Sequence, residues 1–166
     1  SFREKIEIKI EKGSPNEHQI ILNGQGNYDY KSKSYGDLVI VLKEKEHQTF
    51  TRRGYDLYIT LDISIIEALS GFETHIKHLD KRELYIRTEE IIENGMVKVV
   101  KYEGMPRDNT NLLKGNLYIK FNVTYPKVIS SKQKKLLRKL FEMKQMSDTT
   151  KQPCVLSDVN SESTQE

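Results

Sequence analysis

The chain reads Ile6-Glu7-Ile8-Lys9-Ile10, then Gly24-Gln25-Gly26, then Gly36-Asp37-Leu38-Val39-Ile40-Val41-Leu42. The same order returns as Leu84-Tyr85-Ile86-Arg87, then Glu103-Gly104-Met105-Pro106, then Gly115-Asn116-Leu117-Tyr118-Ile119-Lys120-Phe121. These two runs of matching segments indicate that the chain contains one pattern twice.

The spacing within the two copies supports a tandem repeat. Ile8 to Gly26 and Ile86 to Gly104 both span 18 residues, and the following glycines come 10 and 11 residues later. Repeated spacing of this kind predicts two similar β units. About 30 residues, 54–83, precede the shared part of the second copy, whereas almost nothing precedes Ile6. We therefore expect the first unit to be incomplete, with its upstream part outside this sequence.

Alternation of apolar and polar residues predicts most of the secondary structure. Residues 44–54 are almost wholly polar and are expected to form a hinge between the units, and residues 25–35 are expected to form a loop. Ser64 with Glu67 forms a capping box that predicts a short helix over residues 65–70. Strands are expected at residues 2–10, 19–22, 37–43, 56–63, 72–78, 83–87, 98–102 and 117–125.

The expected fold class is mainly β. Two tandem, similar, antiparallel β-sandwich-like domains, the first incomplete, are followed by a C-terminal helix. The expected ranges are residues 1–50 and 51–127 for the two domains, 128–146 for the helix and 147–166 for a polar tail.

The predicted helix carries an apolar side, formed by Leu136, Leu137, Leu140 and Phe141. This side could pack on the chain's own sheet or form a dimer contact. The lysines around it are more typical of a solvated helix face than of a nucleic-acid contact. In the tail, Cys154-Val155-Leu156 is expected to pair with a sheet edge or a partner chain.

Composition excludes several function classes. Charged residues make up 31 % of the chain, mixed in sign with a net charge of +3, which is unlike a dedicated nucleic-acid binder. No apolar run approaches the roughly 20 residues of a membrane span. The single cysteine, Cys154, excludes an internal disulfide within this sequence.

The sequence offers no constellation typical of an enzyme or a metal site. It has no Gly-x-Ser-x-Gly, His-Glu-x-x-His or phosphate-loop motif, so we expect no catalysis. His75 and His78 are expected to point to opposite faces of one strand, which argues against a shared metal ion. Asn122-Val123-Thr124 matches the glycosylation pattern on the outward face of its strand, but modification would require a secretory compartment.

Several motifs together resemble the C-terminal region of DnaJ-type heat-shock co-chaperones. The order and spacing of the motifs carry this resemblance, which runs from about Ile6 to Phe141. The motifs are Phe50-x-Arg52-Arg53-Gly54-x-Asp56-Leu57, Glu67-Ala68-Leu69-x-Gly71-Phe72-Glu73, His78-Leu79-Asp80, Glu103-Gly104-Met105-Pro106 and Lys114-Gly115-Asn116-Leu117.

The resemblance implies a function in handling non-native polypeptides. Family members bind extended apolar segments on the first domain and dimerise through a C-terminal helix. It implies peptide-binding roles for Ile6 and Ile40, with Ile8 on the strand of Ile6, and a homodimer contact by Leu136, Leu137, Leu140 and Phe141. The implied partners are unfolded clients and a DnaK-type chaperone. A scaffold that dimerises without binding clients is the alternative.

Two features of the family are not in this sequence. It has no His-Pro-Asp of a J domain and no zinc-binding Cys-x-x-Cys-x-Gly-x-Gly repeats, so no cofactor is expected here, although a longer protein could hold zinc. Cys154-Val155-Leu156-Ser157-Asp158 resembles zinc-bearing members, whereas Gly71-Phe72-Glu73 and His78-Leu79-Asp80 resemble members of the endoplasmic reticulum. The compartment, endoplasmic reticulum lumen or cytoplasm, stays open.

Overall fold

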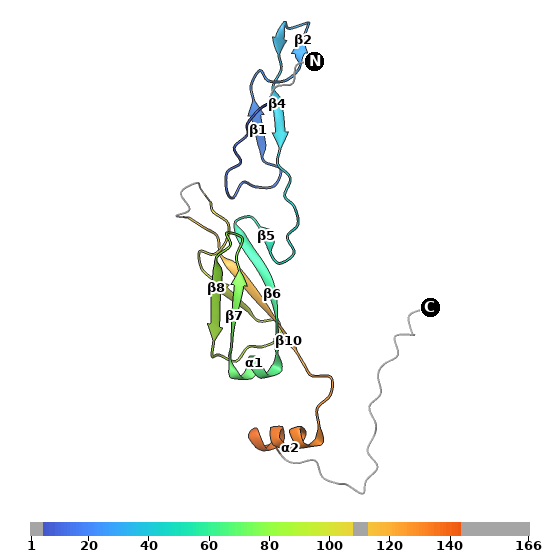
Figure 1. Cartoon of the computed structure of the whole chain (residues 1–166), viewed down its shortest axis with the longest axis vertical. Helices are drawn as coiled ribbons and strands as arrows, with labels where there is room; N and C mark the ends of the chain where they lie inside the picture. Colours follow the sequence, from blue (N-terminus) through green and yellow to red (C-terminus); the bar gives the residue numbers. More distant parts are fainter. Residues whose placement is uncertain (1–4, 108–112, 144–166) are drawn as a thin grey trace, which may run out of the picture. The chain divides into compact units, whose positions relative to one another are not determined.

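The computed structural model describes residues 5–107 and 113–143. The chain divides into two compact units, Ser1–Tyr125 and Pro126–Glu166. Strands dominate the first unit, and the helix α2 belongs to the second (Figure 1). The expected fold class, mainly β with a C-terminal helix, is therefore confirmed. None of the helices in the described ranges has the length and apolar content needed to cross a membrane.

The first repeat forms a long hairpin. Strand β1 (Gln19–Leu22) pairs antiparallel with β4 (Leu38–Val41), which confirms the strands expected there. Between them, β2 (Tyr28–Asp29) and β3 (Ser34–Tyr35) pair as a small second hairpin. Residues 25–35 were expected to form a loop; they contain these two short strands, because the Asp29 carboxylate accepts hydrogen bonds that close a tight turn between them.

The second repeat is built on a four-stranded sheet. Its order is β5 (Thr51–Arg53), β6 (Asp56–Ser64), β10 (Leu117–Thr124) and β9 (Val97–Val100). The outer pairs are antiparallel, but the central pair, β6 and β10, is parallel. The expectation of antiparallel pairing was wrong for these two strands. The long connection through a helix and another hairpin lets β10 enter the sheet in the same direction as β6.

A short helix follows β6 where the capping box predicted it. Helix α1 (Ile65–Ser70) has Ser64 as its N-cap; the Ser64 hydroxyl accepts from the Glu67 N–H, and the Glu67 carboxylate accepts from the Ser64 N–H at 2.8 Å. These reciprocal bonds satisfy donors that the first helical turn leaves open. The helix buries Ala68 against the sheet.

A second layer covers one face of the sheet. Strands β7 (Phe72–Lys77) and β8 (Glu83–Thr88) form an antiparallel hairpin, and the Phe72 ring meets the Phe121 ring edge to face at 5.5 Å. Period-two alternation puts the apolar residues of β6 and β10 on the face toward this hairpin, as expected. The buried hydrophobic residues are Phe50, Leu57, Ile59, Ile63, Ala68, Phe72, Ile76, Ile92, Leu117, Ile119, Phe121 and Val123.

The predicted repeat is visible in the strand register. Gly26 lies seven residues after the start of β1 and Gly104 seven after the start of β9, and β4 matches β10. Leu38 pairs with Leu22 as Leu117 pairs with Val100, and Ile40 pairs with Ile20 as Ile119 pairs with Lys98. The two hairpins therefore have the same register.

The glycines of the repeat perform the same task in both copies. Gly26 N–H donates to the Gly36 carbonyl at 2.7 Å, and Gly36 N–H donates to Asn27. In the second copy, Gly104 N–H donates to the Gly115 carbonyl at 2.9 Å, and Gly115 N–H donates to Met105. A Cβ on Gly26 or Gly104 would lie within 3 Å of backbone atoms, so only glycine allows this close approach. We call each pair of glycines a glycine clamp.

The second unit contains α2 (Ser131–Leu140), capped by Ser130 and Gln133. A helix was expected here over residues 128–146, but within the described residues it covers only 131–140. The predicted ends of this helix region at residues 144–146, the tail 147–166 and its segment Cys154-Val155-Leu156 lie outside the described residues.

The strand expected at residues 2–10 was wrong for its described part. Residues 5–10 form no strand, although they match Leu84–Thr88 in β8 of the second copy. Strand β8 is held by hydrogen bonds to β7. Among the described residues, no neighbouring strand offers such bonds to residues 5–10. The domain boundaries at residues 50 and 127 stay predictions.

Candidate functional site

Ile40 lies on β4, where the first repeat leaves apolar side chains incompletely covered. Ile40 and Leu38 are half-buried, although their counterparts Ile119 and Leu117 are 1 % and 0 % exposed. Within the described residues, β4 pairs with β1 alone, whereas β10 lies between two strands. The apolar side chains and the free backbone edge of β4 are therefore partly uncovered, whereas the equivalent groups of β10 are covered by the second repeat itself.

Ile6 and Ile8 lie in the segment before β1. Ile6 is half-buried and Ile8 is 37 % exposed. No backbone hydrogen bond between residues 5–10 and β1 or β4 is present in the described part of the chain. The structure therefore places Ile40 on a defined strand, and Ile6 and Ile8 on a segment without regular pairing.

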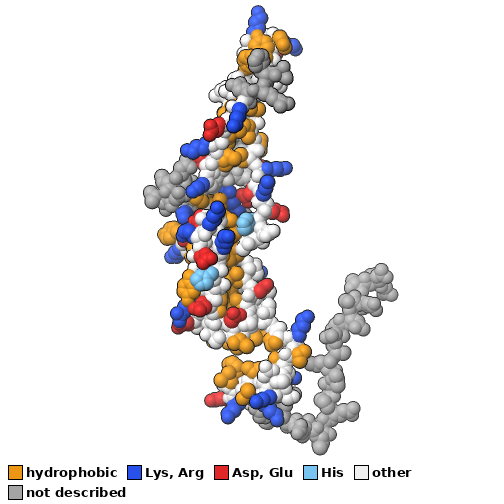
Figure 2. Space-filling model, viewed as in Figure 1, with side chains coloured by type: hydrophobic (Ala, Val, Ile, Leu, Met, Phe, Trp, Pro, Cys, Tyr) orange, Lys and Arg blue, Asp and Glu red, His pale blue; other side chains and the backbone are white. Residues whose placement is uncertain are grey.

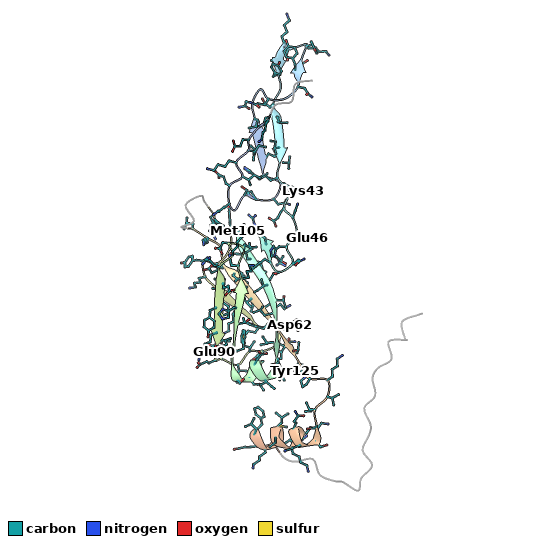
Figure 3. The ribbon with its side chains drawn as sticks, in the orientation of Figure 1. Lys43, Glu46, Asp62, Glu90, Met105 and Tyr125 are labelled. Atoms are coloured by element: carbon teal, nitrogen blue, oxygen red, sulfur yellow. The ribbon has the colours of Figure 1, made fainter. Side chains whose placement is uncertain are left out.

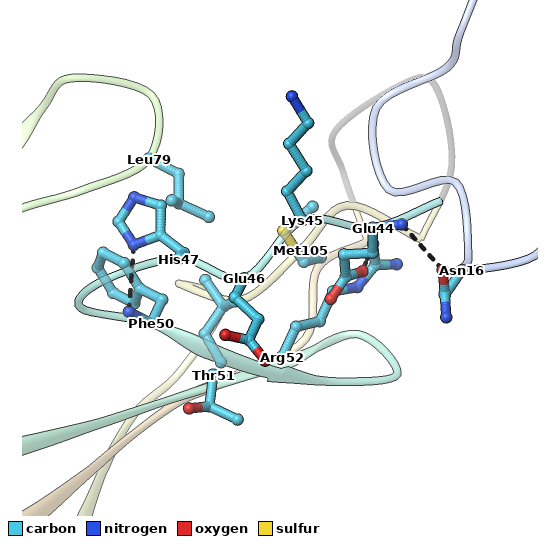
Figure 4. Close-up of a pocket in the computed structure, with 11 residues that line it drawn as sticks. Asn16, Glu44, Lys45, Glu46, His47, Phe50, Thr51, Arg52, Leu79 and Met105 are labelled. Carbon is cyan, nitrogen blue, oxygen red and sulfur yellow. Dashed lines mark hydrogen bonds and ion pairs between the residues drawn. The ribbon is translucent and has the colours of Figure 1, made fainter. Parts of the chain in front are cut away.

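A pocket of about 550 Å³ lies where the 44–52 segment meets the sheet (Figure 4). Phe50 and Leu57 are its buried apolar part, and Leu79 and Met105 also line it. Figure 3 shows Glu46 and Met105 at the same end of the sheet. Sequence reasoning treated this segment as a hinge and missed the pocket. The one available signal was Phe50, an isolated aromatic residue in a polar stretch.

Arg52 holds this region together. Its guanidinium donates to the carbonyls of Gly13, Ser14 and Gly54 at 2.7–2.9 Å and pairs with the Glu44 carboxylate at 3.0 Å. The Arg52 side chain is only 14 % exposed. Because a planar guanidinium can donate in several directions at once, one residue of β5 links the turn before β1 to the sheet.

A second charged cluster surrounds the turn after β7. His78 is 7 % exposed, and its Nε2 lies 3.0 Å from the Glu103 carbonyl. A carbonyl can only accept, so Nε2 carries the proton, while Nδ1 lies 3.4 Å from the Asp80 carboxylate and has no hydrogen-bond partner. His75, in contrast, is exposed and packs on the Tyr85 ring. His78 lies just past the end of β7, so the two histidines do not share a strand as expected, and one is buried while the other is exposed.

Arg82 completes this cluster. It donates to both the Asp80 and the Glu103 carboxylates, at 2.7 Å in each case. Desolvation would raise the pKa of Asp80, but the hydrogen bonds from Arg82 outweigh it and the pKa is lowered. Hydrogen bonds to Glu103 and Asp80 raise the pKa of Arg82. The cluster fixes the His78-Leu79-Asp80 turn against the Glu103 loop and has the character of a structural network.

The apolar side of α2 lies open within its own unit. Leu136, Leu137, Leu140 and Phe141 are 45–73 % exposed, and no residue of α2 is buried. The spacing of these four residues puts them on neighbouring turns. A hollow of about 480 Å³ lies beside Leu137 and Phe141.

Comparison with known proteins agrees with this architecture. The family model described as "DnaJ C terminal domain" matches residues 2–126. The chain belongs to the DnaJ C-terminal domain family. It is 40 % identical over 123 residues to human "DnaJ homolog subfamily A member 2", covering 73 % of this chain and 30 % of that protein. It is 36 % identical over 165 residues to "Chaperone protein dnaJ 3" of Arabidopsis thaliana, covering 95 % of this chain and 39 % of the relative.

The chain thus spans about a third of the length of these DnaJ relatives. The motifs that carried the resemblance have structural tasks in this member of the family. The Asp56 carboxylate accepts from the Asn116 N–H at 2.8 Å, and Met105 N–H donates to the Tyr55 carbonyl. These contacts hold the β5–β6 turn against the second glycine clamp.

Proposed function

We propose that this DnaJ-type co-chaperone region binds non-native polypeptide segments and dimerises through α2, as part of a protein that delivers clients to a DnaK-type chaperone. One observation carries the proposal. The β1–β4 hairpin has the register of β9–β10, but its apolar positions are half-buried where those of the second repeat are fully buried.

An extended client segment can supply what this hairpin lacks. Strand addition provides backbone hydrogen bonds, and apolar side chains of the client cover Ile40 and its neighbours. Ile6 and Ile8 are proposed to contribute further apolar contacts.

The proposed dimer explains the open side of α2. A second copy of α2 would cover Leu136, Leu137, Leu140 and Phe141. Two client sites on one dimer then bind a single unfolded chain with an affinity above that of either site. The proposed role is binding, without a catalytic step.

Mutation of the hairpin tests the client site. Ile6→Asp with Ile40→Asp should weaken binding of a fluorescently labelled apolar peptide and reduce suppression of aggregation of an unfolded client. Val39→Asp with Val41→Asp is the matched control, because these exposed valines occupy the other face of β4. Far-UV circular dichroism checks that both variants fold.

The result separates the client-binding role from the alternative, a dimerising scaffold. Equal peptide affinity in the two double variants would remove Ile6 and Ile40 from the site. A parent protein that neither binds the peptide nor suppresses aggregation would leave only the scaffold role.

A further inference from the structure

Three tyrosines gather on the β2–β3 hairpin at the end of the first repeat. Tyr28, Tyr30 and Tyr35 are 42 %, 86 % and 63 % exposed. In Figure 2, hydrophobic side chains and Lys or Arg side chains lie together at the end that carries this hairpin. We call residues 24–36 the tyrosine hairpin. An exposed aromatic group of this kind serves no packing role in the core, which begins at Phe50.

The tyrosines are held in place by one another. Tyr28 meets Tyr30 and Tyr35 edge to face, with ring centroids 5.1 Å apart in both pairs. Edge-to-face contacts of aromatic rings are favourable in themselves. The three rings therefore form one surface.

The turn that presents these rings is also well defined. The Asp29 carboxylate accepts from the Lys31 N–H at 3.0 Å and from the Ser32 hydroxyl at 2.8 Å. At the base, the first glycine clamp joins Gly26 to Gly36. A turn fixed at both ends loses little conformational entropy when it binds a partner.

The composition of the hairpin is that of a recognition loop. Residues 24–36 read GQGNYDYKSKSYG, in which tyrosine, serine, glycine and asparagine predominate. Antibody loops are enriched in the same residues, because tyrosine gives a large contact area with few rotatable bonds and the small residues adapt their hydrogen bonds. Loops on a defined scaffold are also common positions for binding residues.

The outward charge of the hairpin is positive. Lys31 and Lys33 are exposed at the turn. The negative charge of Asp29 is directed into the turn, where the Lys31 N–H and the Ser32 hydroxyl lower its pKa. A partner with acidic groups beside aromatic or apolar ones complements both features.

We infer that the tyrosine hairpin is a second polypeptide contact site, which selects acidic segments of unfolded clients. The inference rests on the proposed function for its partner, but on different residues from the Ile6, Ile8 and Ile40 site. Aromatic and apolar client side chains pack on the three rings, while client carboxylates pair with Lys31 and Lys33. The site thereby sets a preference among clients.

A comparison of two labelled peptides tests this inference on the whole 166-residue chain. One peptide is apolar and neutral, and the other has the same apolar core flanked by glutamates. The hairpin variant combines Tyr30→Ser, Lys31→Glu and Lys33→Glu. The matched control combines Tyr125→Ser, Lys101→Glu and Lys127→Glu, exposed positions outside the hairpin that give the same change in charge.

Fluorescence anisotropy should show that the hairpin variant binds the acidic peptide about tenfold more weakly than the control does, which corresponds to about 1.4 kcal/mol. The neutral peptide should lose less affinity than the acidic peptide in the hairpin variant, since it loses only its contact with the Tyr30 ring and makes no use of the lysines. Added salt should weaken binding of the acidic peptide to the parent more than binding of the neutral one.

Other outcomes overturn the inference. Equal loss of acidic-peptide binding in both triple variants, with the neutral peptide still bound, would reject the hairpin and leave the proposed function intact. If the parent protein binds neither peptide, both the hairpin inference and the proposed client-binding function are rejected. If an oligodeoxythymidine binds the parent more tightly than the acidic peptide and only the hairpin variant loses it, the hairpin is a nucleic-acid contact instead.

Discussion

At the scale of single residues, Arg52 joins the turn before β1 to the sheet through the hydrogen bonds of its guanidinium. Its guanidinium accounts for three backbone carbonyls and one carboxylate, which come from positions as far apart in the sequence as Gly13 and Gly54. The family resemblance drew attention to Arg52, but no periodic pattern could have found its partners. Carbonyl groups belong to every residue, so the sequence does not show which of them lie within reach of a guanidinium.

Replacement of Arg52 by alanine should lower the free energy of unfolding by about 1–3 kcal/mol, because carbonyls in a partly buried place lose their donors. Urea unfolding followed by circular dichroism measures the change. Arg53→Ala is the comparison, since Arg53 is exposed and lies over the Tyr58 ring at 5.0 Å. If both variants lose the same stability, the bonds of Arg52 to the turn at Gly13 are not important in solution.

At the scale of elements, sequence patterns within a single helix or strand correctly predicted where that element begins and which of its faces is buried. Ser64 and Glu67 gave the start of α1, and the alternation of Leu57, Ile59 and Ile63 gave the buried face of β6. These patterns could not predict whether two paired strands run parallel or antiparallel. Whether β10 runs parallel or antiparallel to β6 depends on the path of the 52 residues between Ser64 and Leu117, not on either strand's own residues.

The capping box of α1 makes a pH-dependent contribution with a definite sign. Hydrogen bonds from the Ser64 N–H and hydroxyl lower the pKa of Glu67. A lowered carboxyl pKa adds stability that is complete above the pKa of the unfolded chain, and that disappears as the pH falls through the folded value. An NMR titration of the Glu67 carboxyl should thus give a pKa below the ordinary glutamate range.

The variant Glu67→Gln provides the control for this titration. It keeps an oxygen that accepts from Ser64 but has no charge to lose, so the acid-sensitive part of the stability should be absent. A Glu67 that titrates at an ordinary value, with parent and variant equally sensitive to acid, would show that the capping box is open in solution.

The mass of the protein in solution tests whether α2 forms a dimer contact. Leu137→Glu with Phe141→Glu should convert a dimer into monomers in light scattering, because two charges on the apolar side cannot be buried without partners. Lys132→Glu with Lys139→Glu changes the charge of the helix away from the apolar side and should leave the mass of the dimer unchanged. A mass that stays the same in the first variant would show that α2 makes no dimer contact.

At the scale of the whole molecule, the two repeats differ in how they are stabilised. Every buried hydrophobic residue in the described ranges lies between Phe50 and Val123. The repeated spacing predicted two similar units, the first of them incomplete. How thinly the β1–β4 hairpin is covered could only be seen in three dimensions, because it depends on which strands pair with it.

Hydrogen exchange should reveal this difference directly. A two-stranded hairpin without a core opens easily, whereas strands inside a packed sheet open only with the domain. The amides of β1 and β4 in the isolated chain should therefore exchange faster than those of β9 and β10, by about a hundredfold for a local difference near 3 kcal/mol. Equal protection of matched amides would mean that the first hairpin is covered in solution.

The glycine clamps have a consequence for how such a chain can change. Each clamp joins the two ends of its turn by a backbone hydrogen bond between the glycines, so the register of the strands is tied to the glycines. The copies already differ by one residue in that interval, 10 against 11, yet keep the same register. The segment between Gly26 and Gly36 is accordingly a position where a foreign recognition sequence could be installed and new selectivity acquired without redesign of the scaffold.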